Sequence, residues 1–256
     1  RTQFWAKQFV VIGVILGCLA GSMWLSLCLG AMRIYQVDEC TNVYVATILS
    51  TGKNTGGVDL FQLLLSWVVP ASNRSVEIFA TARMVMQIVF WLNWVLIAVA
   101  TGEKLFSRRW FTALMAASTL APLWDYGFEV RHDNILLAGL LFTWALVRFG
   151  PPKPVAWFAA GTIAVALQFV ALKAFVYTLP IALLVVILPQ SKPVVARWKL
   201  ALGWTLGAVG MLGVFRFVYG ALGIWVGSAD AHESISYVSS LGHRFGVDIA
   251  LSRLLT

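Results

Sequence analysis

Long uncharged, apolar stretches alternate with short polar segments along this chain. A hydrocarbon layer of about 30 Å is crossed by roughly 20 apolar residues in a helix that rises about 1.5 Å per residue. The first, second and fifth stretches reach this length, the sixth is marginal, and partner helices can surround the ends of the three short ones. The pattern predicts an all-α membrane protein with seven transmembrane helices, over residues 8–32, 84–102, 110–124, 134–147, 154–172, 174–191 and 200–215.

The longest connection between predicted spans, about residues 33–83, has a pattern of its own. After a turn at residues 52–57, residues 58–69 are nearly all apolar. A dozen residues are too few to cross a bilayer, but they can lie in its interface. We therefore expect two short interfacial helices, the first with four residues at helical spacing, namely Val37, Thr41, Tyr44 and Ile48.

Composition agrees with a membrane protein. Of 256 residues, 60% are hydrophobic and 12% are charged, and the mean hydropathy is +0.82. Soluble domains are about half apolar and a quarter charged, so a soluble enzyme, a disordered tail and a disulfide scaffold are poor interpretations. The three cysteines are an odd number, and Cys18 and Cys28 lie inside an apolar run, so neither a disulfide framework nor a zinc site is indicated.

The charges predict an orientation, because cytoplasmic loops collect Lys and Arg. With the N-terminus inside and the C-terminus outside, the outer segments hold nine basic and ten acidic residues. The basic excess of the chain is then cytoplasmic, and nothing indicates nucleic-acid binding. The inner segments hold one acid, Glu103, and ten basic residues: Arg1, Lys7, Lys104, Arg108, Arg109, Arg148, Lys153, Lys192, Arg197 and Lys199.

Small residues recur in the first and last predicted spans. Gly13, Gly17 and Gly21 are four residues apart, as are Gly203 and Gly207. This spacing lets another helix approach closely, so membrane-protein partners could bind there, although glycine is frequent in membrane helices generally.

Candidate chemistry gathers on the predicted outer side. Asp38 and Glu39 follow the first span, and residues 124–133 carry three carboxylates, an arginine and a histidine beside the lipid boundary. Such charges must pair or face a polar cavity, which indicates a site; alternatively Asp133 is the N-cap of the fourth span. Lys173 is the only charge in residues 154–191 and falls at a predicted outer turn, where it could bind a phosphate or simply snorkel to the lipid headgroups.

The order and spacing of these motifs resemble the GT-C superfamily of membrane glycosyltransferases. The likeness begins with one span, then residues 38–44 (DECTNVY), then Arg83 at the start of the second span. Residues 130–137 (VRHDNILL) look like its second acidic motif, and Lys173 with the following stretch to Pro180 looks like its lysine hairpin. Both motifs look like those of the protein mannosyltransferase and lipid A aminoarabinose transferase branch. The resemblance covers roughly residues 8–219.

The resemblance implies a glycosyltransferase that moves a sugar from a polyprenyl-phosphate donor to an acceptor at the outer membrane face, with inversion. Asp38 would be the catalytic base with Glu39 beside it, and Asp133 would orient the phosphate or a divalent cation. The phosphate would bind Arg131, Lys173 and Arg83. Metal dependence varies among branches, and no ligand set here settles it. We expect a bacterial inner membrane with the active face in the periplasm.

Residues 1–219 form the predicted seven-span module, and residues 220–256 read as the start of an outer segment that breaks off. Two other functions remain open. A non-catalytic subunit could keep the scaffold to pack in a larger complex. A lipid or solute transporter is disfavoured because the interiors of the longer spans carry almost no ionisable residues.

Overall fold

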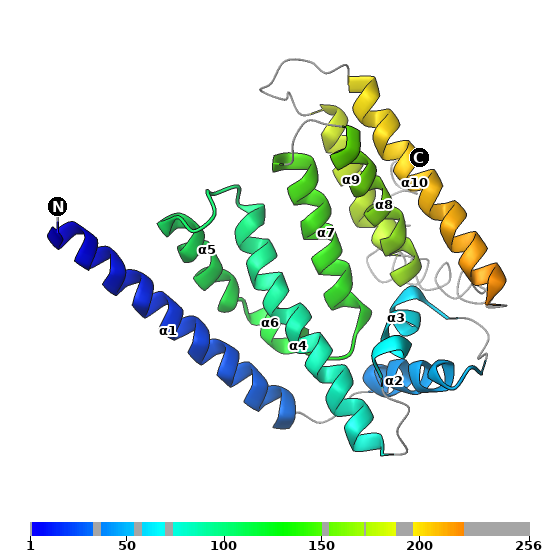
Figure 1. Ribbon diagram of the computed structural model, residues 1–256, viewed down its shortest axis with the longest axis horizontal. Helices are drawn as coiled ribbons and strands as arrows, with labels where there is room; N and C mark the ends of the chain where they lie inside the picture. Colours follow the sequence, from blue (N-terminus) through cyan, green and yellow to red (C-terminus); the bar gives the residue numbers. More distant parts are fainter. Residues whose placement is uncertain are drawn as a thin grey trace, which may run out of the picture.

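A computed structural model describes residues 2–32, 37–53, 58–69, 74–149, 154–171, 173–187 and 197–222. The protein is helical over these ranges, and none of their residues belongs to a strand (Figure 1). The helices are α1 (Thr2–Met32), α2 (Val37–Ser50), α3 (Leu60–Val68), α4 (Ser75–Ala100), α5 (Arg108–Ser118), α6 (Ala121–Tyr126), α7 (His132–Phe149), α8 (Pro154–Val170), α9 (Ala174–Ile187) and α10 (Arg197–Ala221). The predicted outer segment at residues 220–256 lies almost wholly outside the described residues.

Three of the described helices are long and apolar enough to cross a membrane on their own: Val10–Met32, Ser75–Ala100 and Trp198–Ala221. Two further apolar helices, Pro154–Val170 and Ala174–Leu183, are shorter. The all-helical architecture is therefore confirmed, together with three helices suited to a bilayer. Seven crossings and the N-in orientation stay predictions.

The predicted third span is wrong as a single helix. Residues 110–124 divide between α5 and α6, with a break at Thr119 and Leu120. Pro122 lies in the first turn of α6, where its missing N–H costs nothing, whereas inside a continuous helix it would clash with a carbonyl one turn earlier. The proline therefore starts a new helix.

The second span begins earlier than predicted. Absence of charge suggested a start at residue 84, but α4 begins at Ser75 and contains both Glu77 and Arg83. Arg83 is buried and ion-paired, so its charge does not end the helix. A search for uncharged runs cannot find a helix whose charged residues are neutralised by partners elsewhere in the chain.

Both short helices of the first long loop are present, and α2 lies across the axes of α4 and α7 (Figure 1). The residues whose spacing predicted α2 do not all face the protein interior: Thr41 is exposed and Tyr44 is 67% exposed. The buried face carries polar residues as well as apolar ones, namely Glu39, Asn42, Val43 and Ala46.

The start of α3 has a capping box. The Asp59 carboxylate accepts from the Gln62 backbone N–H at 2.7 Å, and the Gln62 side chain accepts from the Asp59 N–H at 3.3 Å. These two bonds satisfy N–H groups that a helix start otherwise leaves without a partner.

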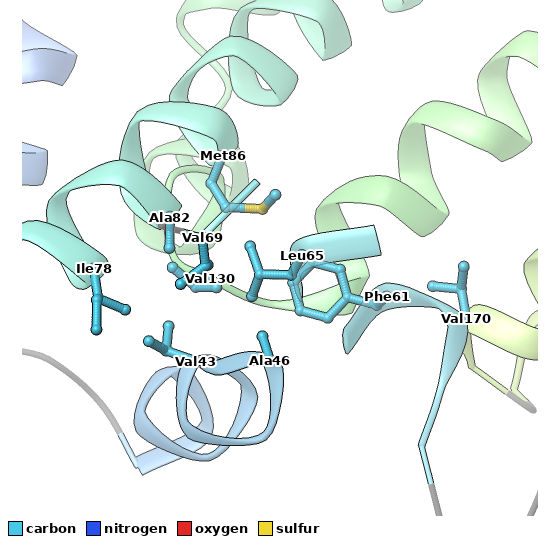
Figure 2. Packing of buried hydrophobic residues seen from close by; sticks show 10 residues of the cluster. All are labelled: Val43, Ala46, Phe61, Leu65, Val69, Ile78, Ala82, Met86, Val130 and Val170. Carbon is cyan, nitrogen blue, oxygen red and sulfur yellow. The ribbon is translucent and has the colours of Figure 1, made fainter. Parts of the chain in front are cut away.

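One apolar core joins the first loop to the bundle (Figure 2). Val43 and Ala46 of α2 face Phe61 and Leu65 of α3, and side chains from α4, α8 and the segment before α7 complete the cluster. Its other buried members are Val69, Ile78, Ala82, Met86, Val130 and Val170. Burial of such side chains contributes about 1.5–3 kcal/mol each, so α2 and α3 belong to the folded body.

The two predicted glycine faces differ. On α10, a Cβ at Gly203 would lie 2.6 Å from the Pro154 carbonyl oxygen, and one at Gly207 would lie 2.1 Å from that of Phe158. This glycine face is therefore occupied by α8 of the same chain. On α1, a Cβ at Gly13, Gly17 or Gly21 would meet nothing within 4 Å.

We predict that Gly207→Ala weakens the contact between α8 and α10, because the added methyl would collide with backbone that cannot move aside. Overpacking of this kind costs about 1–3 kcal/mol. Thermal unfolding in detergent, followed by circular dichroism, measures the loss. Gly210→Ala on the same helix is the matched control, since a Cβ there meets nothing within 4 Å. Equal melting temperatures for the two variants would contradict the close packing.

Candidate functional site

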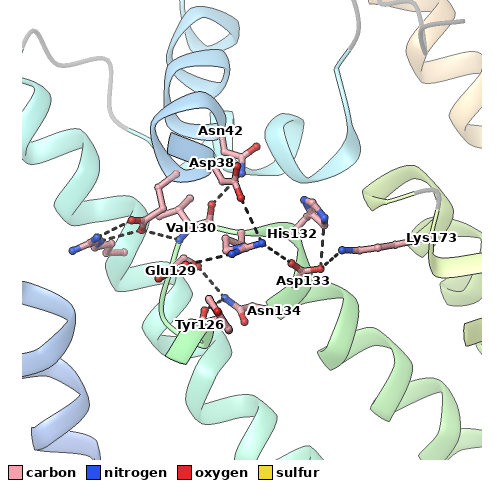
Figure 3. Close-up of polar contacts among 12 residues, drawn as sticks. Asp38, Asn42, Tyr126, Glu129, Val130, His132, Asp133, Asn134 and Lys173 are labelled. Carbon is pink, nitrogen blue, oxygen red and sulfur yellow. Dashed lines mark hydrogen bonds and ion pairs between the residues drawn. The ribbon is translucent and has the colours of Figure 1, made fainter. Parts of the chain in front are cut away.

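Three segments that are distant in the sequence meet at one end of the bundle (Figures 1 and 3). They are the start of α2 with Asp38, the connection from α6 to α7 with Arg131 and Asp133, and the turn between α8 and α9 with Lys173. The opposite end carries the other set of connections, including the C-terminal ends of α4 and α7 and the start of α10 (Figure 1).

Four side chains form a row of ion pairs in which the sign of the charge alternates. Asp38 Oδ2 lies 3.5 Å from Arg131 Nη2, and the same nitrogen lies 3.5 Å from Asp133 Oδ2. Lys173 Nζ lies 2.5 Å from Asp133 Oδ1. Asp38 is the most exposed of the four at 62%, followed by Lys173 at 48% and Asp133 at 36%. The row is open to a ligand at both ends.

Arg131 is the centre of this row and has further neighbours. Its guanidinium carbon lies 5.2 Å from the centre of the Tyr126 ring, a cation–π distance, and Nη1 lies 3.7 Å from Glu129 Oε2. The Glu129 side chain is fully buried, whereas the Arg131 side chain is 25% exposed. The guanidinium is therefore oriented from several sides and still reaches the surface.

Neighbouring charges act on the two titratable residues that begin α7. Burial would raise the pKa of Asp133, but the Lys173 hydrogen bond and the charges of His132, Lys173 and Arg131 outweigh burial, so this pKa is lowered. Burial lowers the pKa of His132, and Lys173 and Arg131 add to this against the attraction of Asp133 and Asp38. At neutral pH Asp133 is ionised and His132 is neutral.

Neither alternative interpretation of Asp133 and Lys173 describes their geometry. The helix α7 begins at His132, so Asp133 lies within its first turn, and its carboxylate faces Lys173 and Arg131. Lys173 is held in an ion pair, so it does more than extend toward lipid headgroups. The side chain of Asp125, another acid of the predicted motif, lies outside the described residues.

Glu39 and Arg83 form a separate, buried pair. Arg83 donates to Glu39 from Nε at 3.1 Å and from Nη2 at 2.7 Å, and from Nη1 to the Gly30 carbonyl oxygen at 2.7 Å. The Glu39 side chain is 0% exposed and that of Arg83 is 9% exposed. Because protein acceptors take up most of the guanidinium, the geometry favours a structural role for this pair over acid–base catalysis by Glu39 and phosphate binding by Arg83.

Two asparagines near the site were not singled out from the sequence. Asn42 donates from Nδ2 to the Val130 carbonyl oxygen at 3.0 Å. Asn134 donates from Nδ2 to the carbonyl oxygens of Tyr126 and Glu129, at 3.0 and 2.9 Å. Asn42 could have been found, since it follows Glu39 by three positions and so shares its side of a helix. Asn134 follows the charged motif directly but has no comparable signal.

Metal ligation was left open by the sequence. Across the described ranges, no group of three or more His, Cys, Asp and Glu side chains has a geometry that could hold a metal ion. The carboxylates of Asp38 and Asp133 both face Arg131, which supplies positive charge between them.

Comparisons of the chain with protein-family models, with curated proteins and with solved structures give no match. Any functional conclusion must therefore come from the residues and their geometry.

We predict that Arg83→Met strongly destabilises the protein, because it leaves the Glu39 carboxylate buried without its cation. Removing one partner of a buried ion pair costs about 3–5 kcal/mol. The free energy of unfolding in mixed detergent micelles measures this loss. The control is Arg74→Met, which breaks the exposed pair between Arg74, the N-cap residue of α4, and Glu77 and should cost about 1 kcal/mol or less. Similar losses in both variants would show that burial of the Glu39–Arg83 pair has no energetic consequence.

The lowered pKa of Asp133 predicts a pH-dependent stability. A carboxyl group whose pKa is lower in the folded than in the unfolded state stabilises the fold above its usual value of 3.8 and loses this effect as the pH falls through the folded value. Lys173→Met removes the main partner of Asp133. The difference in melting temperature between wild type and Lys173→Met should therefore be largest near neutral pH and shrink below about pH 4. Lys53→Met, at an exposed lysine, should show no such trend; a constant difference for Lys173→Met would count against the pairing.

Proposed function

We propose that this chain is a membrane glycosyltransferase that transfers a sugar from a polyprenyl-phosphate donor to an acceptor hydroxyl or amine. The observation that carries the proposal is the row formed by Asp38, Arg131, Asp133 and Lys173, drawn from three distant segments. These four charges come together at one end of an apolar bundle and stay between 25% and 62% exposed, so a charged headgroup can reach them there.

Asp38 is the general base of the proposed reaction. Its carboxylate is the most exposed of the row and can accept the proton of an acceptor held beside it. The acceptor atom then forms a bond to the anomeric carbon as the bond from that carbon to the phosphate oxygen breaks. The phosphate departs with the bonding electrons, so negative charge grows on its oxygen. Inversion at the anomeric carbon follows from attack opposite to the leaving group.

Lys173 and Arg131 stabilise that departing phosphate. An ammonium and a planar guanidinium are the usual cationic partners of phosphate oxygens, and both sit against Asp133. Asp133 keeps the two cations close together before the donor binds, so less reorganisation is needed during the reaction. In this scheme the buried Glu39–Arg83 pair holds the helices that carry the site in place and does not contact the substrate.

The distribution of charge supports an outward-facing site. The described end of the bundle opposite the row carries exposed basic side chains, among them Arg108, Arg109 and Lys199, and one acid, Glu103. By the tendency of Lys and Arg to remain cytoplasmic, the row faces the periplasm if the membrane is the bacterial inner membrane. In this orientation Lys173 lies at the outer end of the α8–α9 hairpin, where we expect it to meet the phosphate of a polyprenyl donor in the outer leaflet.

A non-catalytic membrane subunit is the second candidate, and one observation favours it. Most of the stretch Val10–Met32 of α1 is not buried, and a Cβ at Gly13, Gly17 or Gly21 on its glycine face would meet nothing within 4 Å. A partner helix on this face could belong to a larger complex whether or not the chain has catalytic activity.

Asp38→Asn should lower the rate of transfer about a hundredfold or more, because an amide cannot act as the base. The assay follows radiolabelled sugar from a panel of polyprenyl-phosphate sugars, including mannose and aminoarabinose, into chloroform-insoluble product. Glu77→Gln is the matched control, since Glu77 is a half-exposed acid outside the row. Full activity in Asp38→Asn would remove the proposed site. Three results together would favour the subunit function. The wild-type chain transfers no sugar, deletion of the chain prevents assembly of a complex, and the Asp38→Asn variant still supports that assembly.

A further inference from the structure

Val130 is a buried residue at the centre of a tight turn, and side chains bind both its N–H and its carbonyl oxygen. The Arg131 N–H donates to the Glu129 carbonyl oxygen at 2.8 Å, the bond of a γ-turn centred on Val130. The turn bond uses neither the N–H nor the carbonyl oxygen of Val130, so both can bind side chains. The N–H donates to Glu39 Oε1 at 3.0 Å, and the carbonyl oxygen accepts from Asn42 Nδ2 at 3.0 Å. Val130 itself is 0% exposed.

Glu39 and Asn42 can hold the two groups together because they share one face of α2. Residues three apart on a helix are neighbours, and this separation suits the donor and acceptor of a single residue. One supplies an acceptor and the other a donor, as the backbone of a β-strand would do. We call these two residues, with their bonds to Val130, the α2 clamp.

Each half of the α2 clamp is supported by a further residue. Arg83 donates two hydrogen bonds to the Glu39 carboxylate, which fix its direction. Gln62 of α3 donates from Nε2 to Asn42 Oδ1 at 3.2 Å, so the Asn42 amide is oriented with its nitrogen toward Val130. Asn42 is 7% exposed, so water competes little for these bonds.

The α2 clamp bears on the ion-pair row because Arg131 follows Val130 directly and Asp38 precedes Glu39 directly. Asp38 and the clamp belong to the same helix, so the position of α2 sets both the carboxylate of Asp38 and the backbone from which Arg131 extends. A shift of α2 by one helical residue would break the clamp and separate Asp38 from Arg131 at once.

We infer that Glu39 and Asn42 are positioning residues, which hold the Val130 γ-turn so that the Arg131 guanidinium lies between Asp38 and Asp133. Their effect on catalysis rests on the proposed transfer reaction. Their effect on Arg131 does not, and it can be measured on the full chain without any substrate.

The first test uses Asn42→Leu, which removes the bond to the Val130 carbonyl in a residue of similar size. Hydrogen exchange read by mass spectrometry should speed up in the peptide containing residues 128–131, by about fivefold as expected for one lost hydrogen bond, with α8 and α10 unchanged. Modification of Arg131 by p-hydroxyphenylglyoxal should accelerate relative to Arg74, whose side chain is 80% exposed and serves as the internal reference. Tyr44→Phe, on the exposed side of α2, should leave both rates unchanged.

Asn42→Ala is the second variant, because it removes the same bond to the Val130 carbonyl with a smaller side chain, leaves the buried Glu39–Arg83 pair intact, and keeps the inference testable if Asn42→Leu fails to fold. It should accelerate exchange of the same peptide. Wild-type exchange and wild-type Arg131 reactivity in a folded variant would overturn the inference. Faster rates spread evenly over the whole chain would also overturn it, since they would report general loosening.

The transfer assay separates this inference from the proposed function. If both are right, Asn42→Leu raises the KM for the polyprenyl-phosphate sugar severalfold through misplacement of Arg131, whereas mere loss of folded protein lowers the apparent kcat and leaves KM unchanged. Changed exchange and Arg131 reactivity in a chain that transfers no sugar would uphold the clamp and reject the function. Transfer that depends on Asp38 but is indifferent to Asn42→Leu would reject the clamp and keep the function.

Discussion

The fold at the charged end of the bundle depends on one buried carboxylate. Glu39 lies on α2, accepts from Arg83 of α4 and from the backbone before α7, and Arg83 in turn donates to the carbonyl of Gly30 at the end of α1. An ionised group without partners is very costly away from water, so the helices that supply these partners must dock together. The apolar core around Val43 and Phe61 favours docking of the helices but does not select one orientation. The hydrogen bonds of the carboxylate are directional, so they fix the relative positions of the helices.

The surface row depends on this buried pair for its geometry. Asp38 and Glu39 are adjacent on a helix, so their side chains point about 100° apart, one toward solvent and one into the protein. The same division recurs in the segment before α7, where Glu129 is buried and Arg131 reaches the surface. Each charged motif thus contributes one residue that anchors its segment and one that remains accessible. This division of roles explains why paired charges in the sequence do not all belong to a reaction centre.

The sequence predicted features that depend on the average composition of a segment, and it missed features that depend on single contacts. Apolar runs located most of the described helices, and charge patterns identified Asp38, Arg131, Asp133 and Lys173, whose side chains lie together although their roles stay predictions. The break before Pro122 was missed because both sides of it are uncharged. The early start of α4 and the structural place of Arg83 were missed because they depend on Glu39, which is distant in the sequence. The buried face of α2 was not identified, since it carries Glu39 and Asn42, which a search for apolar spacing passes over.

The close seam between α8 and α10 bears on how such a chain is made at the ribosome. A Cβ at Gly161 would collide with the Trp204 carbonyl. The glycine therefore leaves room on α8 for the backbone of α10. Because α8 and α9 precede α10 in the sequence, they are synthesised first; in the folded protein the hydrogen bond from Gln168 Nε2 to Thr178 Oγ1 at 2.8 Å joins them. The face of α8 at Gly161 gains its packing partner only when α10 has been synthesised. The α8–α9 hairpin that carries Lys173 therefore acquires its contact with α10 only after α7, which carries the Asp133 partner of Lys173, has been synthesised.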